Sequence, residues 1–339
     1  MNRRAVCAAL VFCGLVGGGC KPKRKGPPGA RVLQIAVIPK GTTHDFWKSI
    51  HAGARAGAEA MSRQFAAEKP NGIVGVEIFW KGPLREDDRE QQIQVVEGFT
   101  AQEVDGIVLA PLDARALIRP VEEALRLHIP TVVIDSALDY PDIVSQISTN
   151  NFHGGELAAV QLGRKLNGKG KAIMLRYQQG SASTEEREAG FLSKLKKDFP
   201  GIQLISDDQH GGPSRDTAKR SAENLLNRFG DEVQGMFGPN EPIAMGILLA
   251  LQDVGRAGKV ILVGFDSTPA VVQATRKGEV HGFVVQDPFT MGKRGVEIMA
   301  LHLAGKGVSK AETTPAVLVT AENIDEPEIA RLVAPVASQ

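Results

Sequence analysis

DGIVLAPLD (residues 105–113), with IPTVVIDSALD (129–139) following it, is the stretch that best indicates the fold. Each segment has a short apolar run, which is typical of a buried strand, and leaves it through a polar loop. Residues 114–128 between them are expected to form a helix. An apolar strand, a helix and a second apolar strand predict one unit of a parallel α/β sheet.

The same pattern occurs again as QGMFGPNEP (234–242) and GKVILVGFDSTP (258–269). In both copies the second strand ends on an aspartate followed by serine, at Asp135 and Asp266. That aspartate lies 30 positions after the first residue of one copy and 32 positions after the first residue of the other. This diverged repeat predicts two similar lobes, whose strand-exit loops would face each other across one cleft and enclose a ligand.

The rest of the body alternates between strands and helices in the same way. Further strands are expected at residues 32–38, 72–80, 147–151, 171–177, 202–206, 280–286 and 316–320. Helices are expected at 41–69 and 86–101, after 155, and between 288 and 305. The predicted fold class is therefore α/β, with two similar doubly wound, parallel-sheet lobes.

The first strand leads into a loop with the chemistry of a small-ligand site, RVLQIAVIPKGTTHDFW (31–47). In open α/β sheets, ligands bind where loops leave the carboxyl ends of strands. Lys40 and His44 are donors there, and Phe46 and Trp47 offer flat apolar faces. The alternative is a solvent-exposed loop with a core aromatic residue.

Asp135 and Asp266 are the strongest candidate binding residues, because a carboxylate accepts hydrogen bonds from two adjacent hydroxyls. The alternative for each is a helix cap. Arg187 offers a planar fork of donors, with a surface ion pair as its alternative. Asn240 and Gln286 both donate and accept. Phe265 is a third possible stacking ring, for which core packing is the standing alternative.

Charge and composition exclude several function classes. From Val32 onward the chain has 33 basic and 39 acidic residues, whereas a nucleic-acid surface needs clustered positive charge. All three cysteines lie within the first 20 residues, so the body has no thiolate site. The seven histidines are not at metal-ligand spacing, and GRKLNGK (163–169) lacks the Ser or Thr of a phosphate loop. No metal, cofactor or catalytic residue is predicted.

The first 20 residues are typical of a secretory signal peptide. Arg3 and Arg4 precede an apolar run that ends in Gly17-Gly18-Gly19-Cys20. Small residues before a cysteine resemble a bacterial lipobox and predict lipidation at Cys20. Ordinary cleavage and an uncleaved anchor are the alternatives. Residues 21–30 (KPKRKGPPGA) are expected to be a flexible tether.

The chain resembles the type 1 periplasmic binding proteins, specifically the ribose-binding-like subunits of ABC sugar importers. The resemblance covers about 30–325, through DGIVLAP, IPTVVIDS, TNNFHGG, EREAGF, FGPNEPIAMG, LVGFDSTP and VVQDPFTMG. It implies an N-terminal lobe (31–149 and 287–315) and a C-terminal lobe (150–286 and 316–330). Three hinge crossings would join them, near 149–151, 286–288 and 314–316.

Position by position, the family's ligand residues fall on His44, Phe46, Trp47, Asp135, Arg187, Asn240, Phe265, Asp266 and Gln286. Ser136 and Ala110 stand where the ribose type has Arg and Asn, which argues against ribose itself. IPK (38–40) and KGP (81–83) are closer to the rhamnose-binding and furanosyl-autoinducer-binding branch, whose lysine contacts the ligand. This similarity adds Lys40.

The resemblance implies a monomeric, non-enzymatic, extracytoplasmic protein anchored through Cys20. It would close its hinge on a sugar or polyol and deliver it to a membrane permease and its ATPase. A sensor for chemotaxis or quorum sensing is one alternative. An enzyme that acts on sugars is another, with Asp135 and Asp266 as its acid and base.

Overall fold

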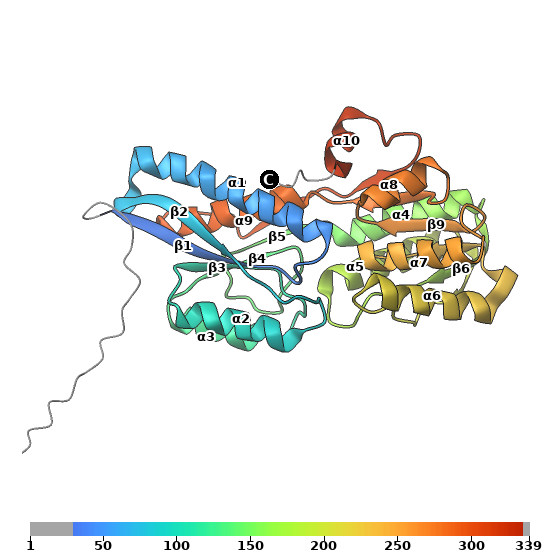
Figure 1. Ribbon diagram of the computed structural model, residues 1–339, viewed down its shortest axis with the longest axis horizontal. Coiled ribbons are helices and arrows are strands. Elements are labelled where there is room, and N and C mark those ends of the chain that lie inside the picture. Colours follow the sequence, from blue (N-terminus) through green and yellow to red (C-terminus); the bar gives the residue numbers. More distant parts are fainter. Residues whose placement is uncertain (1–29, 335–339) are drawn as a thin grey trace, which may run out of the picture.

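The computed structural model describes residues 30–334, so the predicted signal peptide, Cys20 and residues 21–29 of the predicted tether lie outside the described residues. The described chain forms two six-stranded sheets side by side (Figure 1). The first has the order β11-β5-β4-β3-β1-β2. Its strands are β1 (Arg31–Ile38), β2 (Ile73–Trp80), β3 (Gly106–Leu109), β4 (Thr131–Ile134), β5 (Ser145–Thr149) and β11 (Ala311–Thr314).

The second sheet has the order β12-β10-β9-β8-β6-β7. Its strands are β6 (Lys169–Met174), β7 (Gly201–Ser206), β8 (Gly235–Phe237), β9 (Ile261–Phe265), β10 (Gly282–Val285) and β12 (Val317–Val319). Apart from β12, neighbouring strands in both sheets pair in parallel. We call the first sheet with its helices the N-terminal lobe and the second the C-terminal lobe.

In the N-terminal lobe, helices cover both faces of the sheet (Figure 1). One face packs on α1 (Asp45–Glu68) and α9 (Pro288–Leu303), and the other on α2 (Arg89–Ala101) and α3 (Ile118–Arg126). With both faces buried, the central strands β3 and β4 are apolar along their whole length.

The C-terminal lobe repeats this arrangement. One face of its sheet packs on α4 (Asn151–Lys165) and α5 (Ala182–Asp198). The other packs on α6 (Arg215–Phe229), α7 (Glu241–Asp253), α8 (Pro269–Arg276) and α10 (Pro327–Val333). Short 3₁₀ turns at Pro70–Gly72 and Gly230–Glu232 complete the secondary structure. The fold prediction of two doubly wound α/β lobes is confirmed.

The chain passes between the two sheets three times, after β5, after β10 and after β11. Parallel strands end at the cleft between the lobes, so a segment that enters a lobe from the cleft runs away from it. That direction explains why β12, which follows β11 across the cleft, pairs antiparallel with β10. Sequence patterns alone had indicated only parallel strands.

Some predicted boundaries were wrong. The first helix begins at Asp45 rather than Gly41, and the second at Arg89 rather than Glu86. In the second case the Asp88 side chain accepts a hydrogen bond from the backbone N–H of Gln91 and so fixes the start. No helix among residues 30–334 is long and apolar enough to cross a membrane.

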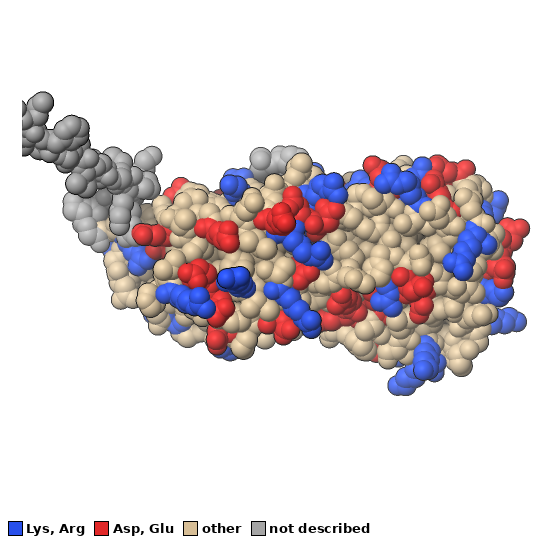
Figure 2. Space-filling model, turned by 90° about the horizontal axis from the view of Figure 1, so that it is seen from below, with Lys and Arg blue, Asp and Glu red and all other residues tan. Residues whose placement is uncertain are grey.

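Charges on the surface are mixed. On the face shown in Figure 2, basic and acidic side chains lie among one another over both lobes. Among the described residues, several exposed charges pair within one helix, such as Arg126 with Glu122 and Glu123. Such exposed pairs contribute little to stability, and they leave the face without a broad field of one sign.

Candidate functional site

A small cavity between the two lobes gathers most of the predicted ligand residues. Its volume is about 30 Å³. It is lined by nine of the ten predicted residues, namely Lys40, His44, Phe46, Trp47, Asp135, Arg187, Asn240, Asp266 and Gln286. The cavity is also lined by residues that the sequence did not indicate, namely Glu86, Tyr177, Ser181, Ser183, Thr184, Glu241 and Pro242.

The strand-exit loops of both lobes supply these side chains. Lys40 follows β1 and Asp135 follows β4 in one lobe, whereas Asp266 follows β9 and Gln286 follows β10 in the other. Because the parallel strands of each lobe end at the cleft, loops far apart in the sequence meet there. This convergence is the predicted cleft between the two copies of the repeat.

Lys40 lies at the centre of the site. Its Nζ is 2.7 Å from Oδ2 of Asp135 and donates to Oγ of Ser183 at 3.1 Å. Both members of the ion pair are almost fully buried, at 4% and 3% exposed. The alternative of a solvent-exposed loop is therefore wrong for Lys40, which joins a carboxylate of its own lobe to the opposite lobe.

The two repeated aspartates share an unusual backbone conformation. Asp135 has φ 64° and Asp266 has φ 65°, in the left-handed region. Aspartate and asparagine enter this region more readily than other non-glycine residues, and such strained positions concentrate at functional sites. Each conformation turns the chain sharply at the end of its strand, at equivalent places in the two lobes.

Asp266 does not cap the helix that follows it, since Thr268 does so. Its Oδ1 accepts from Nε2 of Gln286 at 2.6 Å, and its Oδ2 accepts from the backbone N–H of Glu241 at 3.2 Å. Asn240 caps α7 with its side-chain oxygen, which leaves the amide nitrogen as the group available to a ligand. Burial raises the pKa of Asp266 despite the opposing effect of Arg187.

Arg187 is buried, not in a surface ion pair. Its Nε donates to Oδ1 of Asn151 at 2.9 Å, and its Nη1 donates to the carbonyl oxygen of Pro239 at 3.0 Å. The guanidinium carbon lies 3.9 Å from the ring centre of Phe265. Phe265 itself does not line the cavity and packs in the core of the C-terminal lobe. The geometry therefore places Phe265 beneath Arg187, not as a wall of the site.

Glu86 is the most connected residue that the sequence analysis missed. One carboxylate oxygen accepts from Nε1 of Trp47 at 2.6 Å and lies 2.7 Å from Nδ1 of His44. The other accepts from the hydroxyl of Tyr177, which belongs to the opposite lobe. Glu86 thus orients the indole and the imidazole and ties the two lobes together. The only signal in the sequence was its place in the charged loop after KGP.

The contacts of Glu86, His44 and Tyr177 explain why the pKa values of these three groups are shifted. Burial alone would raise the pKa of Glu86, but the hydrogen bonds from His44, Tyr177 and Trp47 outweigh it and lower the pKa to about 2. Burial lowers the pKa of His44, but Glu86 and Glu241 outweigh it and raise the pKa above 6.5. Burial also raises the pKa of Tyr177, which keeps the phenol a donor.

We expect the stability of the folded protein to fall as pH rises above 6.5, because of His44. The pKa of His44 is higher in the folded protein than in the unfolded chain, so protonated His44 stabilises the fold. This stabilisation is at its full size when the pH is below the pKa of the unfolded chain, and it is lost as the pH rises through the pKa of the folded protein. The measurement is the melting temperature from pH 5.5 to 8.5 for wild type and His44→Gln. The difference between the two curves should narrow as pH rises. Parallel curves would contradict the assignment.

Three polar atoms of the C-terminal lobe have no hydrogen-bond partner in the described part of the chain. They are Oγ of Ser181, Nη2 of Arg187 and Oε2 of Glu241, all buried and on residues that line the cavity. A buried polar group without a partner is costly, so natural proteins retain few of them. Hydroxyl groups of a ligand could satisfy all three, because a hydroxyl both donates and accepts.

The cavity as it stands is too small for a sugar ring. About 30 Å³ is the share of one water molecule in the liquid, whereas small-molecule sites span about 300–1,000 Å³. Interlobe contacts such as that of Lys40 with Ser183 close it. Ligand entry therefore requires the lobes to move apart, which the three crossings allow.

Comparison with known proteins places the chain in a family. Residues 35–307 match the family described as the periplasmic binding protein domain. Among curated relatives, the xylitol-binding protein of Mycolicibacterium smegmatis is 25% identical over 96% of this chain and 88% of its own.

Two solved structures are similar over the same region. A carbohydrate transporter solute-binding protein from Agrobacterium radiobacter, in complex with D-arabinose, is 28% identical with a TM-score of 0.82. It matches 89% of this chain and 99% of its own. An ABC transporter solute-binding protein from Agrobacterium vitis with bound D-fucose is 31% identical with a TM-score of 0.79. It matches 89% of this chain and all of its own.

The fold and the interlobe site are those of a solute-binding protein with two hinged lobes. This chain belongs to the periplasmic binding protein family. The family predicted from the sequence is thus confirmed.

Proposed function

We propose that this protein captures a sugar or polyol outside the cytoplasm by hinge closure and delivers it to an ABC permease. One observation carries the proposal: nine predicted ligand residues, from six segments of the chain and from both lobes, line one cavity. Its carboxylates, amides and guanidinium suit a ligand rich in hydroxyls. Phe46 and Trp47 supply apolar faces for the ring.

The direct test is a thermal-shift panel that includes xylitol, D-arabinose and D-fucose. A ligand at 100 times its Kd stabilises the folded protein by about 2.7 kcal/mol, which corresponds to a rise of several degrees in the melting temperature. At least one sugar or polyol should produce this rise. No shift with any sugar, polyol or furanosyl compound would contradict the proposal.

The site acts by binding, not by catalysis. In the closed arrangement Asp135 pairs with Lys40, and Asp266 accepts a hydrogen bond from Gln286. A typical glycoside hydrolase needs one carboxyl group as general acid and a second as general base or nucleophile. Incubation of purified protein with a bound sugar should therefore return that sugar unchanged, as seen by NMR. The appearance of a product would favour the enzyme.

Anchoring through Cys20 remains a proposal from the N-terminal sequence. It is supported by the run of three glycines before Cys20 and by the basic residues that follow, which favour an anionic membrane surface. Replacement of Cys20 by alanine should move the protein from the membrane fraction to the soluble extracytoplasmic fraction. Retention in the membrane would favour an uncleaved anchor.

Glu241 is proposed as a ligand contact beyond the ten predicted residues. Its Oε1 accepts from Nε of Arg215 at 2.6 Å, whereas its buried Oε2, which lies 3.8 Å from Nδ1 of His44, accepts no hydrogen bond and can accept one from a ligand hydroxyl. We expect Glu241→Gln to weaken binding of the sugar identified in the panel about tenfold, since a hydrogen bond to a charged group contributes about 1.5–3 kcal/mol. Isothermal titration calorimetry measures the change.

A matched control for Glu241 is Glu223→Gln on α6. Glu223 pairs with Lys219 on its own helix, where the change should leave the Kd as it is. An unchanged Kd in Glu241→Gln would mean that Glu241 serves only to hold Arg215.

A further inference from the structure

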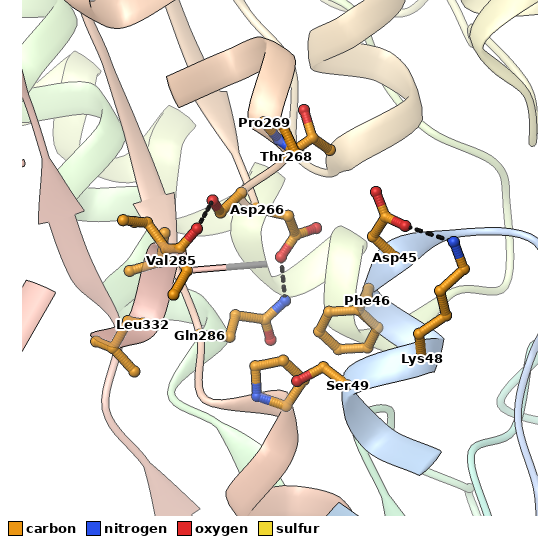
Figure 3. Close-up of a pocket in the computed structure, with 14 residues that line it drawn as sticks. Asp45, Phe46, Lys48, Ser49, Asp266, Thr268, Pro269, Val285, Gln286 and Leu332 are labelled. Carbon is orange, nitrogen blue, oxygen red and sulfur yellow. Dashed lines mark hydrogen bonds and ion pairs between the residues drawn. The ribbon is translucent and has the colours of Figure 1, made fainter. Parts of the chain in front are cut away.

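A second, larger cavity, whose lining is shown in Figure 3, shares wall residues with the ligand cavity and lies next to the hinge. Its volume is about 230 Å³, against about 30 Å³ for the ligand cavity. Three residues line both cavities: Phe46, Asp266 and Gln286. We call this second cavity the hinge chamber. Its volume corresponds to about seven or eight water molecules, which is room for one ring with its substituents.

The wall between the two cavities is built from both lobes and the hinge. Phe46 is on α1 of the N-terminal lobe, Asp266 follows β9 of the C-terminal lobe, and Gln286 is on the crossing after β10. Gln286 donates to Asp266 at 2.6 Å and accepts from the hydroxyl of Thr149, on another crossing, at 2.8 Å. Phe46 and Asp266 belong to different lobes, so this wall is complete only where the two lobes meet.

The lining of the hinge chamber is mixed in character. Val285 and Leu332 are apolar, whereas Ser49 is polar and Asp45 pairs with Lys48 at the outer edge (Figure 3). Phe46 is only half-buried and stands with its ring edge-on to Trp47. A chamber with an apolar wall and a polar rim suits a ring that has an apolar face and polar substituents.

From this geometry we infer that the protein takes ligands longer than one sugar ring, namely glycosides. The first ring occupies the ligand cavity, and the group attached to it occupies the hinge chamber. Such a ligand enters while the lobes are open and lies across the wall formed by Phe46, Asp266 and Gln286 as they close. The inference rests on the proposed function, because it requires the first ring to bind between the lobes.

The experiment compares a free sugar with its glycoside in wild type and in variants that fill the chamber. The probes are D-fucose and D-arabinose with their 4-nitrophenyl glycosides, and the readout is the Kd from calorimetry. Ser49→Trp fills the chamber from α1, and Leu332→Trp fills it from α10. Glu59→Trp, on the exposed side of α1, is the matched control.

We expect wild type to bind at least one glycoside as tightly as its parent sugar or more tightly. Each filling variant should weaken that glycoside at least tenfold and leave the parent sugar within twofold, while Glu59→Trp changes neither. A parent sugar that binds while no glycoside does would overturn the inference and leave the proposed function intact. Filling variants that weaken the binding of the sugar and of its glycoside equally would also overturn the inference. Failure of every sugar and glycoside would instead overturn the proposed function, and this inference with it.

Discussion

Asp266→Asn is expected to weaken sugar binding by about 100-fold or more and to change the stability of the ligand-free protein only slightly. The change replaces a carboxylate, which accepts from two hydroxyls, by an amide with one acceptor. Each hydrogen bond to a charged group contributes about 1.5–3 kcal/mol, and 1.4 kcal/mol is a factor of ten in Kd. Calorimetric titration with the sugar identified in the panel measures the loss.

The expected stability follows from burial and backbone conformation. Burial raises the pKa of Asp266, so the folded protein holds this charge at a cost in stability that a neutral asparagine avoids. Asparagine has one acceptor oxygen for the two donors Gln286 and Glu241, so it loses one hydrogen bond, and the two effects oppose each other. Asparagine also tolerates the left-handed conformation at φ 65°, whereas alanine would add about 1–2 kcal/mol of strain. Asparagine is for this reason the better probe of function, because Asp266→Ala would also lower the melting temperature.

Asp113→Asn is the matched control for Asp266. Asp113 also follows a strand, β3, but pairs with Nε of Arg89 at 2.8 Å and does not line the ligand cavity. We expect this variant to bind sugar normally. If Asp266→Asn instead binds normally, or if its ligand-free melting temperature falls by many degrees, then Asp266 has a structural role and not a binding role.

Gly155→Ala is expected to destabilise the protein by about 3 kcal/mol or more and to weaken ligand binding. A Cβ at Gly155 would overlap the backbone carbonyl of Arg187, where α4 crosses α5. No rotamer change can move a backbone oxygen, so the two helices must separate. Overpacking of side chains alone costs about 1–3 kcal/mol. Since Arg187 is on the displaced helix, its position in the site changes too.

The matched control is the same glycine-to-alanine substitution at Gly98. Gly98 lies within α2, and a Cβ there meets nothing within 4 Å. Gly98→Ala should raise stability by about 0.5–1 kcal/mol, because alanine favours the helix more than glycine does. The melting temperature of Gly155→Ala should fall by roughly 6 °C or more. Equal melting temperatures of the two variants would show that the α4–α5 contact adapts to the extra methyl group.

The N-terminal lobe also has helix glycines that lie against backbone carbonyls of a neighbouring helix. Gly53 on α1 faces the carbonyl of Phe289, and Gly292 on α9 faces the carbonyl of Ile50. In each lobe, then, a pair of helices is in backbone contact on one face of the sheet. This contact holds the start of α1, with Phe46 and Trp47, against the crossing after β10. Gly154 and Gly155 stand out in the sequence only as part of the family motif TNNFHGG. A glycine within a helix does not indicate by itself which other helix will pack against it.

Local patterns predicted much of the fold. Apolar strands such as 131–134 and the aspartates that end them identified both lobes, because buried parallel strands need unbroken apolar runs. Helices α6, α8 and α10 and strand β11 were not predicted from the sequence. The buried stripe of α6 has only two large apolar residues, Leu225 and Leu226, beside Ala218 and Ala222, and β11 (AETT) has one buried residue. Strand β11 is defined by its pairing with β5.

Some residues of the candidate site could also be predicted from the sequence, and others could not. Lys40, Asp135 and Asp266 could be found from the sequence because each follows a strand, and the topology of parallel sheets brings strand ends together. Glu86 and Tyr177 could not, because they are 91 positions apart and meet only across the closed lobes. Phe265 was assigned to the site as a possible stacking ring that matches an aromatic ligand residue of the family, yet alternation along β9 turns its ring under Arg187.

Two α/β lobes, the loops that face the cleft and the polar side chains of those loops can all be predicted from the sequence. They follow from periodicity and from a repeated pattern, which are properties of neighbouring residues. Three features become visible only in the folded chain: the groups that remain without partners, the link that Glu86 makes between the lobes, and the hinge chamber beside the ligand cavity. Those features depend on how closely the two lobes approach, and that distance is set by contacts among residues far apart in the chain.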